Sequence, residues 1–207
     1  MICEVDCPHM HNNSHKLFQD FLGREMHDLG MTGGRVLDVG SKDVNGSYRQ
    51  YFGDAWEYVG IDIENGPGVD LVVSASGKWK LGQMFDLVVC GQTLEHVPRP
   101  WILMKTVGRH IRKGGLMYLS APFCWDHHSY PKDCYRYSPT GLSIMVKCAG
   151  CKPLRSELHN AGIEGKPYYS ESVAIGYKTK DSMVWKSPST ISTTVTPPPS
   201  AGSSVAG

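Results

Sequence analysis

Val36-Leu37-Asp38-Val39-Gly40-Ser41 is the stretch that decides the fold class of this 207-residue chain. A short apolar run that ends in Asp, Gly and Ser is typical of a buried parallel strand that leads into a ligand-binding turn. Gly40 lets the backbone turn sharply and approach a ligand that a Cβ would block. The segment therefore predicts a parallel sheet with a binding site at the carboxyl ends of its strands.

Similar apolar runs, bounded by Gly, Asp or Pro, recur along the chain and alternate with helical patterns. Helical spacing covers 14–29, with Asn13 or Ser14 as N-cap, and 101–111, which Lys113-Gly114-Gly115 closes. A third helix follows Ser138-Pro139 and ends near Cys148. The predicted strands are 35–39, 58–63, 70–73, 85–90, 115–121, 152–159 and 171–178. This order predicts a doubly wound α/β sheet with a hairpin-like pair of strands at its end.

Composition excludes several classes of protein. With 21 Lys+Arg against 20 Asp+Glu the net charge is +1, which argues against a broad nucleic-acid-binding face. No apolar run approaches the roughly 18 residues that span a bilayer, so we expect no membrane contact. The seven cysteines, an odd number, suit a reducing compartment, and we expect a cytoplasmic protein.

The composition also predicts where the folded domain lies. Residues 1–13 form a polar, His-rich N-terminal extension, 14–178 the domain, and 179–207 a disordered Ser/Thr/Pro-rich tail. Cys3 and Cys7 with the nearby histidines leave a zinc site open, but their spacing is irregular. Cys148 and Cys151 have CxxC spacing, and we expect Cys151 to fill an apolar slot.

Two further strand ends carry residues suited to ligand binding. Asp62 ends the run Val59-Gly60-Ile61-Asp62-Ile63, where a carboxylate accepts both hydroxyls of a ribose. A later run, 85–91, leads into Gln92-Thr93-Leu94-Glu95-His96-Val97. In this order the segments resemble the class I S-adenosylmethionine-dependent methyltransferases, in particular their type 11-like branch. The resemblance covers about residues 15–178 and also rests on Asp43-Val44-Asn45-Gly46-Ser47, Gly66-Pro67-Gly68-Val69-Asp70, Arg112-Lys113-Gly114-Gly115-Leu116 and Pro122-Phe123.

The resemblance implies a Rossmann-like, seven-stranded, mostly parallel sheet with an antiparallel final strand, and S-adenosyl-L-methionine as cofactor. Asp38 would meet the methionine amino group through water, and Asp62 would hold the ribose. The remaining cofactor-binding residues that it implies are Gly40 and Ser41 beside the methionine, Ile63, Ser74 and Ala75 beside the adenine, and Cys90 and Gly91 near the sulfonium.

Two departures from the family pattern leave an alternative open. Ser41-Lys42-Asp43 follows Gly40, so the usual second glycine of the first loop is absent. In the loop after the third strand, Ser74 or Ser76 stands where an acid is common. The alternative function is therefore a catalytically weak or inactive S-adenosylmethionine-binding partner subunit.

The segment 121–139 predicts the acceptor end of the site, because it follows the fifth strand and is dense in polar and aromatic residues. His127 or His128 is the expected catalytic base. Trp125, Tyr130, Arg136 and Tyr137 are the expected acceptor-binding residues. Two alternatives stay open: the aromatic rings pack the loop onto the sheet, and Arg136 forms an ion pair with Asp133.

We therefore expect a methyltransferase that acts on an O or N of a small-molecule or carbohydrate-linked acceptor. An NAD-dependent oxidoreductase would need Gly-x-Gly-x-x-Gly after the first strand, which the chain lacks. Gln92-Thr93-Leu94-Glu95-His96 resembles a Glu-x-x-Glu-His metal motif of some other methyltransferases, with Gln92 in place of the first Glu. With that carboxylate lost we expect no metal, and Glu95 and His96 with His127 stay open as a divalent-ion site. The oligomeric state is not predicted.

Overall fold

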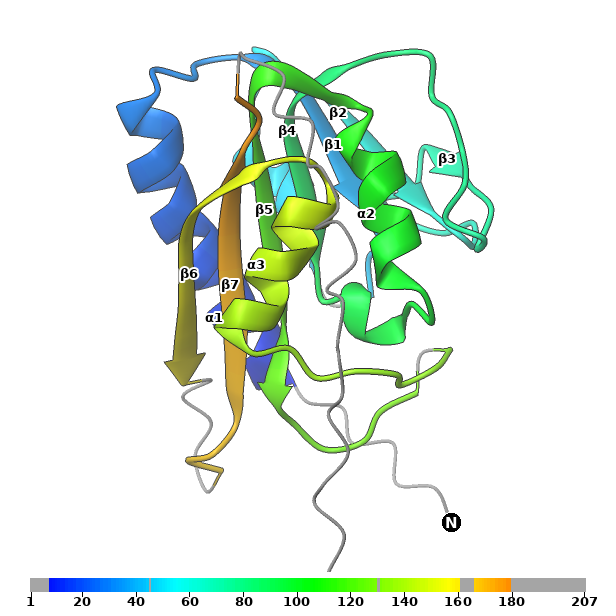
Figure 1. The fold of residues 1–207 in the computed structure, drawn as a ribbon, viewed down its shortest axis with the longest axis vertical. Helices are drawn as coiled ribbons and strands as arrows, with labels where there is room; N and C mark the ends of the chain where they lie inside the picture. Colours follow the sequence, from blue (N-terminus) through cyan, green and yellow to red (C-terminus); the bar gives the residue numbers. More distant parts are fainter. Residues whose placement is uncertain (1–7, 45, 130, 161–165, 180–207) are drawn as a thin grey trace, which may run out of the picture.

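A single seven-stranded sheet organises the computed structural model, which describes residues 8–44, 46–129, 131–160 and 166–179. The strand order is β3-β2-β1-β4-β5-β7-β6 (Figure 1). Strands β1 to β5 pair in parallel, whereas β7 is antiparallel to both of its neighbours, β5 and β6. The predicted Rossmann-like, mostly parallel sheet with an antiparallel final strand is confirmed. The strands are β1 (Gly34–Val39), β2 (Trp56–Asp62), β3 (Leu71–Val72), β4 (Phe85–Gly91), β5 (Ile111–Cys124), β6 (Lys152–Asn160) and β7 (Ser170–Tyr177).

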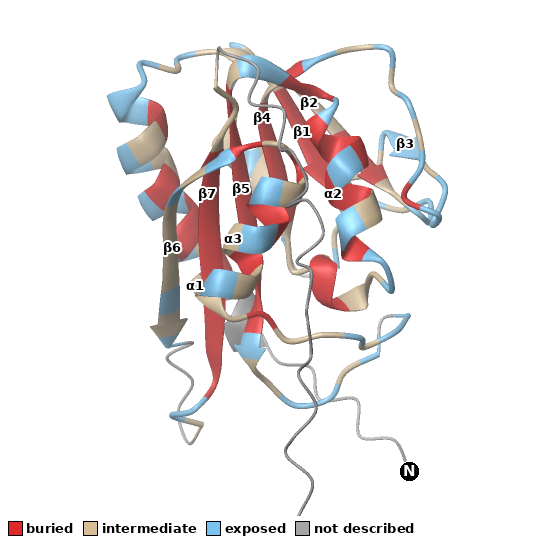
Figure 2. Cartoon of the chain, in the orientation of Figure 1, coloured by how far each residue is buried: buried red, intermediate tan, exposed pale blue. Residues whose placement is uncertain are grey.

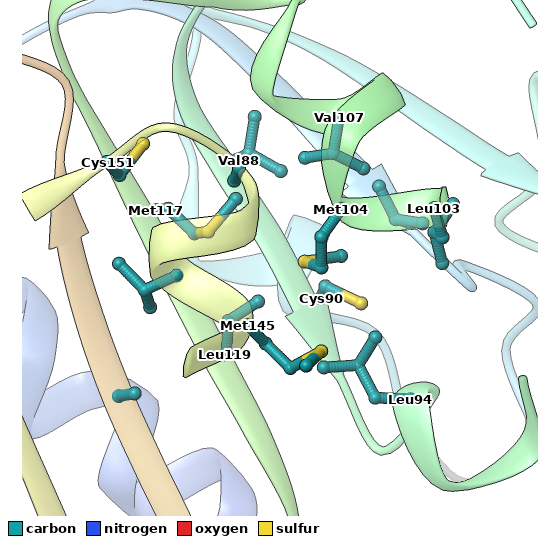
Figure 3. Close-up of a cluster of buried hydrophobic side chains, with 14 of the residues drawn as sticks. Val88, Cys90, Leu94, Leu103, Met104, Val107, Met117, Leu119, Met145 and Cys151 are labelled. Atoms are coloured by element: carbon teal, nitrogen blue, oxygen red, sulfur yellow. The ribbon is translucent and has the colours of Figure 1, made fainter. Parts of the chain in front are cut away.

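Helices cover both faces of the sheet, as the near-continuous apolar strands predict. In Figure 1, α2 (Pro100–Gly108) and α3 (Pro139–Cys148) lie in front of the sheet, and α1 (Pro8–Phe21) lies behind it. Side chains of opposite pleat enter two separate cores: Val88 and Met117 pack with α2 and α3, whereas Leu87 and Tyr118 pack with α1. Figure 3 shows part of the core that lies between the sheet and helices α2 and α3. The central strands are buried, while β3 and β6 are exposed edges (Figure 2).

Short helical segments complete the fold and position the site. The π-helix η1 (Leu22–Met26) continues α1, and the 3-10 helix η2 (Tyr48–Tyr51) precedes β2. A second 3-10 helix, η3 (Leu94–His96), follows the carboxyl end of β4. None of the helices in the described part of the chain is long and apolar enough to cross a membrane.

Two predicted helix ends are wrong. The first helix begins at Pro8, not at Asn13 or Ser14, because the Ser14 hydroxyl donates to the Glu171 carboxylate at 2.8 Å rather than capping the helix. The second helix ends at Gly108, and Lys113-Gly114-Gly115 lies within β5. Gly114 has φ +87°, so the Gly-rich pattern that predicted a helix end serves an irregularity in the β4–β5 pairing.

Other expectations hold, and some fall outside the described residues. Ser138 caps α3, since its hydroxyl accepts from the Gly141 N–H at 3.1 Å. Cys151 is buried in the core between the sheet and α2 and α3, as expected. The N-terminal extension is described only from Pro8 onward, where it is part of α1. The tail from residue 180, and the zinc site that Cys3 and Cys7 left open, lie outside the described residues.

Candidate active site

A cavity of about 800 Å³ opens at the carboxyl ends of the parallel strands. Its walls come from the residues that follow β1, β2, β3 and β4, from the segment between η3 and α2, and from the loop after β5. Binding at this edge is the general rule for open α/β sheets, because the loops there diverge on either side of a switch in strand order. Of the residues predicted to bind the cofactor, those lining the cavity are Asp38, Gly40, Ser41, Asp62, Ile63, Ser74, Ala75 and Gly91.

Asp38 places a buried carboxylate at the cavity wall, with 4% of its surface exposed. Its Oδ2 accepts a hydrogen bond from the Tyr58 hydroxyl at 2.6 Å. Burial raises the pKa of Asp38 to about 7, while the Tyr58 hydrogen bond and the charge of Arg49 act in the opposite direction. The carboxylate is thus poised to gain or lose a proton near neutral pH.

Asp62 ends β2, and backbone groups fix its carboxylate. Oδ1 accepts from the N–H groups of Ile63 at 2.7 Å and Glu64 at 3.2 Å, and Oδ2 accepts from the Lys42 N–H at 3.1 Å. These contacts hold the turns after β1 and β2 together. A carboxylate has about four acceptor positions, and three are filled here, so Oδ2 keeps a lone pair for a further donor.

A packing contact requires glycine at position 40, and the sequence did not indicate this contact. The φ of Gly40 is +81°, and a Cβ placed on it would lie 2.2 Å from the Thr93 hydroxyl oxygen. That hydroxyl is itself held, because it donates to the backbone carbonyl of Val39 or of Gly91, at 3.1 and 2.9 Å. The glycine therefore lets the turn after β1 pack against the turn after β4.

Gly40→Ala should destabilise the protein by about 1–3 kcal/mol, the usual cost of a side chain forced into a strained backbone conformation. Urea denaturation of the purified protein measures this difference. Gly53→Ala is the matched control, since a Cβ there meets nothing within 4 Å. Equal stability of the two variants would contradict the packing role of Gly40.

Cys90 and Gly91 lie at the end of β4 but differ in what they present. The Cys90 side chain points into the core with α2 and α3, near Met104 and Leu94 (Figure 3), and the residue does not line the cavity. A Cβ on Gly91 would lie 2.4 Å from the Tyr48 hydroxyl. Gly91 thus brings the β4 backbone close to Tyr48 and to the cavity.

The side expected to face adenine is exposed and lacks an acid. Ile63 is 42% exposed, and Ser74 and Ala75 form an exposed turn. Within this turn the Ser74 hydroxyl donates to the Ser76 hydroxyl at 2.9 Å. The two serines in the place of the acid are therefore hydrogen-bonded to each other and stabilise the turn.

The loop after β5 brings only part of the predicted acceptor set to the cavity. Trp125 and His128 line it, whereas His127 is exposed and does not. Tyr130 lies outside the described residues. Tyr137 is buried, does not line the cavity, and donates its hydroxyl to the Leu94 carbonyl at 3.2 Å.

Arg136 holds the loop together rather than facing the cavity. Its guanidinium donates to both Asp133 oxygens and to the carbonyls of Asp126 and Tyr135. Asp133 in turn accepts from the His128 N–H at 2.8 Å, and these partners keep the pKa of Asp133 well below its usual range. The ion pair that the sequence left open is therefore present, and it positions the backbone of His128.

The sequence did not predict several of the residues that line the cavity. Ser14 and His15 come from α1, Tyr48 from η2, and Trp79 from the segment between β3 and β4. The His15 ring also meets the Tyr51 hydroxyl at 3.1 Å. Nothing in their local spacing signalled a site, since helix α1 and the 48–51 turn reach the cavity only through the tertiary fold.

The chain matches a methyltransferase family model over most of its length. Residues 11–143 match the family model described as "Methyltransferase domain", which is more than half of the chain. The chain therefore belongs to this methyltransferase family. With its class I fold, it is an S-adenosylmethionine-dependent methyltransferase.

Solved structures support the fold at low sequence identity. An S-adenosylmethionine-dependent methyltransferase from Clostridium acetobutylicum ATCC 824 superimposes with a TM-score of 0.58 at 9% identity, over 80% of this chain and 92% of that one. The Burkholderia thailandensis 1,6-didemethyltoxoflavin-N1-methyltransferase gives 0.57 at 14% identity, over 86% and 93%. The N-methyltransferase NodS from Bradyrhizobium japonicum WM9 gives 0.59 at 11% identity, over 84% and 99%. A search of curated proteins gives no significant match.

The residues of the cavity fit this cofactor. Asp38 and Asp62 offer carboxylates for a cationic amino group and for paired hydroxyls. Ser41 lines the cavity, and its buried hydroxyl has no hydrogen-bond partner among the described residues. The cavity volume also falls within the range of about 300–1,000 Å³ that is usual for small-molecule sites.

Proposed function

We propose that this methyltransferase transfers a methyl group from S-adenosylmethionine to an oxygen or nitrogen of a small-molecule or carbohydrate-linked acceptor. The observation that carries the proposal is one continuous cavity, which runs from Asp38 and Asp62 to Trp125 and His128. A cofactor held by the first pair and an acceptor held by the second would therefore meet within it. The Burkholderia thailandensis N-methyltransferase of the same fold, which was solved with 1,6-didemethyltoxoflavin bound, supports a small-molecule acceptor.

The strand ends would hold the cofactor. Asp62 accepts the two ribose hydroxyls, and Asp38 meets the methionine amino group through water. Gly40 and Ser41 border the methionine, and Ile63, Ser74 and Ala75 border the adenine. Gly91 and the backbone of Cys90 lie near the sulfonium, whose positive charge backbone carbonyl dipoles favour.

The loop after β5 would hold the acceptor. The bound cofactor supplies a methyl group activated by a positively charged sulfur, and the electron pair of the broken C–S bond stays on that sulfur. The acceptor forms the new bond to the methyl carbon and loses its proton. Trp125 provides an apolar wall that excludes water, and His128, the one of the two candidate histidines that lines the cavity, promotes loss of that proton.

Cofactor affinity should depend on pH through Asp38. Because its pKa lies at about 7, the carboxyl is largely protonated at pH 6, and pairing with an amino cation requires the ionised form. The groups that face it are Tyr58, Arg49 and Asp62. Affinity for S-adenosylmethionine should therefore rise with pH, by nearly tenfold per pH unit below about pH 6 and less steeply toward pH 7, and binding of the cofactor should release a proton.

Isothermal titration in two buffers of different ionisation enthalpy measures both the affinity and the released proton. Asp38→Asn has no proton to release, so its affinity should be weak and flat over this pH range. A wild-type affinity that does not change with pH would contradict the role given to Asp38.

The acceptor class is tested by turnover with a panel of small amines, phenols, hydroxy acids and sugars. Formation of S-adenosylhomocysteine above the rate without acceptor is the expected result for at least one O–H or N–H compound. Tight cofactor binding without turnover on any acceptor of the panel would favour the alternative, an inactive S-adenosylmethionine-binding partner subunit. The turn formed by Ser74 and Ser76, which lacks the usual acid, gives that alternative its structural basis.

A reducing compartment such as the cytoplasm suits this chain. The described cysteines are free: Cys90, Cys124, Cys134, Cys148 and Cys151. Cys134 is exposed and would be open to oxidation in an oxidising compartment.

A further inference from the structure

Three metal-ligating side chains converge at the acceptor end of the cavity. Glu95 and His96 belong to η3, and His128 lies in the loop after β5. One ligand atom from each residue, a carboxylate oxygen or an imidazole nitrogen, lies within 4.8 Å of the other two. All three residues line the cavity. The fold thus gathers the donors of a metal site from two separate segments.

The Glu95 carboxyl group is buried and forms no direct ion pair with a lysine or arginine among the described residues. The residue is 0% exposed, and neither carboxylate oxygen has a hydrogen-bond partner among the described residues. The nearest basic nitrogen is the His96 Nε2, 3.7 Å from Oε1. Burying an unpaired carboxylate costs several kcal/mol, about the penalty for any ion removed from water. A cation bound beside this group would offset that penalty.

Both imidazole rings direct their free nitrogen away from the backbone. The Nδ1 of His96 lies 2.5 Å from the Lys132 carbonyl oxygen, and the Nδ1 of His128 lies 3.2 Å from that of Asp126. Because a carbonyl only accepts, each Nδ1 carries the hydrogen in the neutral ring, and each Nε2 keeps its lone pair. A backbone carbonyl on the second nitrogen is the usual support of a metal-bound histidine.

Hydrogen bonds hold the two segments in register. The N–H groups of Cys134 and Tyr135 donate to the Glu95 backbone carbonyl at 2.7 and 3.2 Å. The His128 N–H donates to Asp133, which Arg136 fixes. The rings of His96 and His128 meet edge to face, with centroids 5.1 Å apart and planes at 89°. The two segments that carry the donors are therefore held together before any ligand binds.

We propose that Glu95, His96 and His128 bind a divalent transition-metal ion of the Zn²⁺ type. One carboxylate and two imidazoles are a donor set of catalytic zinc sites, which keep the fourth position open. Imidazole nitrogen favours such ions over Mg²⁺ and Ca²⁺, which prefer oxygen. In a tetrahedral zinc site the ligand atoms lie about 3.4 Å apart, so modest rotation of the two partly exposed rings completes the geometry.

This donor set differs from the one that the sequence left open. Gln92 is engaged elsewhere, since its Nε2 donates to Glu171 at 2.6 Å. His127 is exposed and does not line the cavity, and His128 takes its place. The expectation of no metal rested on the missing first carboxylate, and the convergence of His128 supplies a third ligand instead.

A role for the ion follows if the proposed function is correct, and this step rests on it. The open position faces the cavity that would hold the acceptor. An acceptor oxygen or nitrogen bound there would lose its proton more readily, because a bound cation stabilises the anionic form. His128 would then promote proton loss as a ligand of the ion.

Metal binding is tested on the full chain after removal of metal with a chelator. Titration with ZnCl₂ should show one equivalent bound per chain. Glu95→Gln, His96→Ala and His128→Ala should each weaken binding at least about 100-fold, since even loss of a ligand's supporting partner costs 10–100-fold. His159→Ala, an exposed-strand histidine paired with Glu157, is the matched control and should bind as the wild type does. Melting temperatures and S-adenosylmethionine affinity show whether each variant is folded.

Two further arms locate and classify the ion. Cys3→Ser/Cys7→Ser should keep the full stoichiometry, and Co²⁺ in the site should show no thiolate charge-transfer absorption. Mg²⁺ should bind at least about 100-fold more weakly than Zn²⁺. Loss of the equivalent in the cysteine variant, or equal affinity in Glu95→Gln and wild type, would overturn the proposal.

The outcomes separate this proposal from the proposed function. If Zn²⁺ does not bind while S-adenosylmethionine does, the metal site is wrong and the methyltransferase assignment of the cavity stands. If Zn²⁺ binds at these residues while no acceptor is methylated, the metal site stands and the acceptor proposal fails.

Discussion

Asp62→Ala should lower the affinity for S-adenosylmethionine at least about 100-fold. Two ribose hydroxyls donating to one carboxylate contribute about 3 kcal/mol or more, because hydrogen bonds to a charged group are worth about 1.5–3 kcal/mol each. Isothermal titration of wild type and variant measures the difference. Asp62 also accepts from the backbone of Lys42, Ile63 and Glu64, so its loss loosens the loop as well.

Two companion variants separate ribose binding from loop structure. Asp62→Asn keeps one carbonyl oxygen and the shape of the side chain, so it should retain the fold. Its affinity should fall about tenfold, because one hydrogen bond to a charged group is lost. Asp54→Ala removes an exposed acid at the opposite end of β2 and should bind the cofactor as the wild type does. Wild-type affinity in Asp62→Ala would show that the ribose lies elsewhere.

His128→Ala should lower turnover by about 100-fold or more, the usual contribution of a group that assists proton transfer. The acceptor is the compound that the panel identifies, and initial rates at saturating S-adenosylmethionine give kcat. His127→Ala should lower kcat by no more than about twofold, because a residue outside the cavity makes no contact with the transition state.

Comparison of the two variants isolates the effect of position, because the two histidines are adjacent and chemically identical. If His127→Ala is the slower enzyme, the loop would have to present the other ring during turnover, and the role given to His128 would be wrong. Equal rates in both variants and wild type would remove histidine from the acceptor chemistry altogether.

Much of the fold was predictable because local pattern and tertiary role agree. The strand β4 is apolar on both faces because α1 packs on one side and α2 and α3 on the other, and its sequence shows this as the continuous apolar run from Leu87 to Cys90. The ends of α1 and α2 were mispredicted where one signal has two structural uses. Gly114 and Ser14 are typical of helix ends, yet here they serve a strand irregularity and a hydrogen bond to Glu171.

The cofactor end was more predictable than the acceptor end. Asp38, Gly40 and Asp62 sit at strand ends, and the sheet topology alone brings strand ends together. Which of His127 and His128 faces the cavity depends on the Asp133–Arg136 pair that fixes the loop, and no periodicity encodes that choice. Ser14 and His15 reach the cavity through the packing of a whole helix, which local spacing does not reveal.

Titration of the wild-type protein with S-adenosylmethionine and with S-adenosylhomocysteine tests the central claim most directly. A cavity that holds both the ribose and the amino-acid end of the cofactor predicts saturable binding of both compounds, one per chain, in the micromolar range or tighter. Absence of binding at about millimolar concentration, where even a weak contact of about 4 kcal/mol would be measured, would contradict the account.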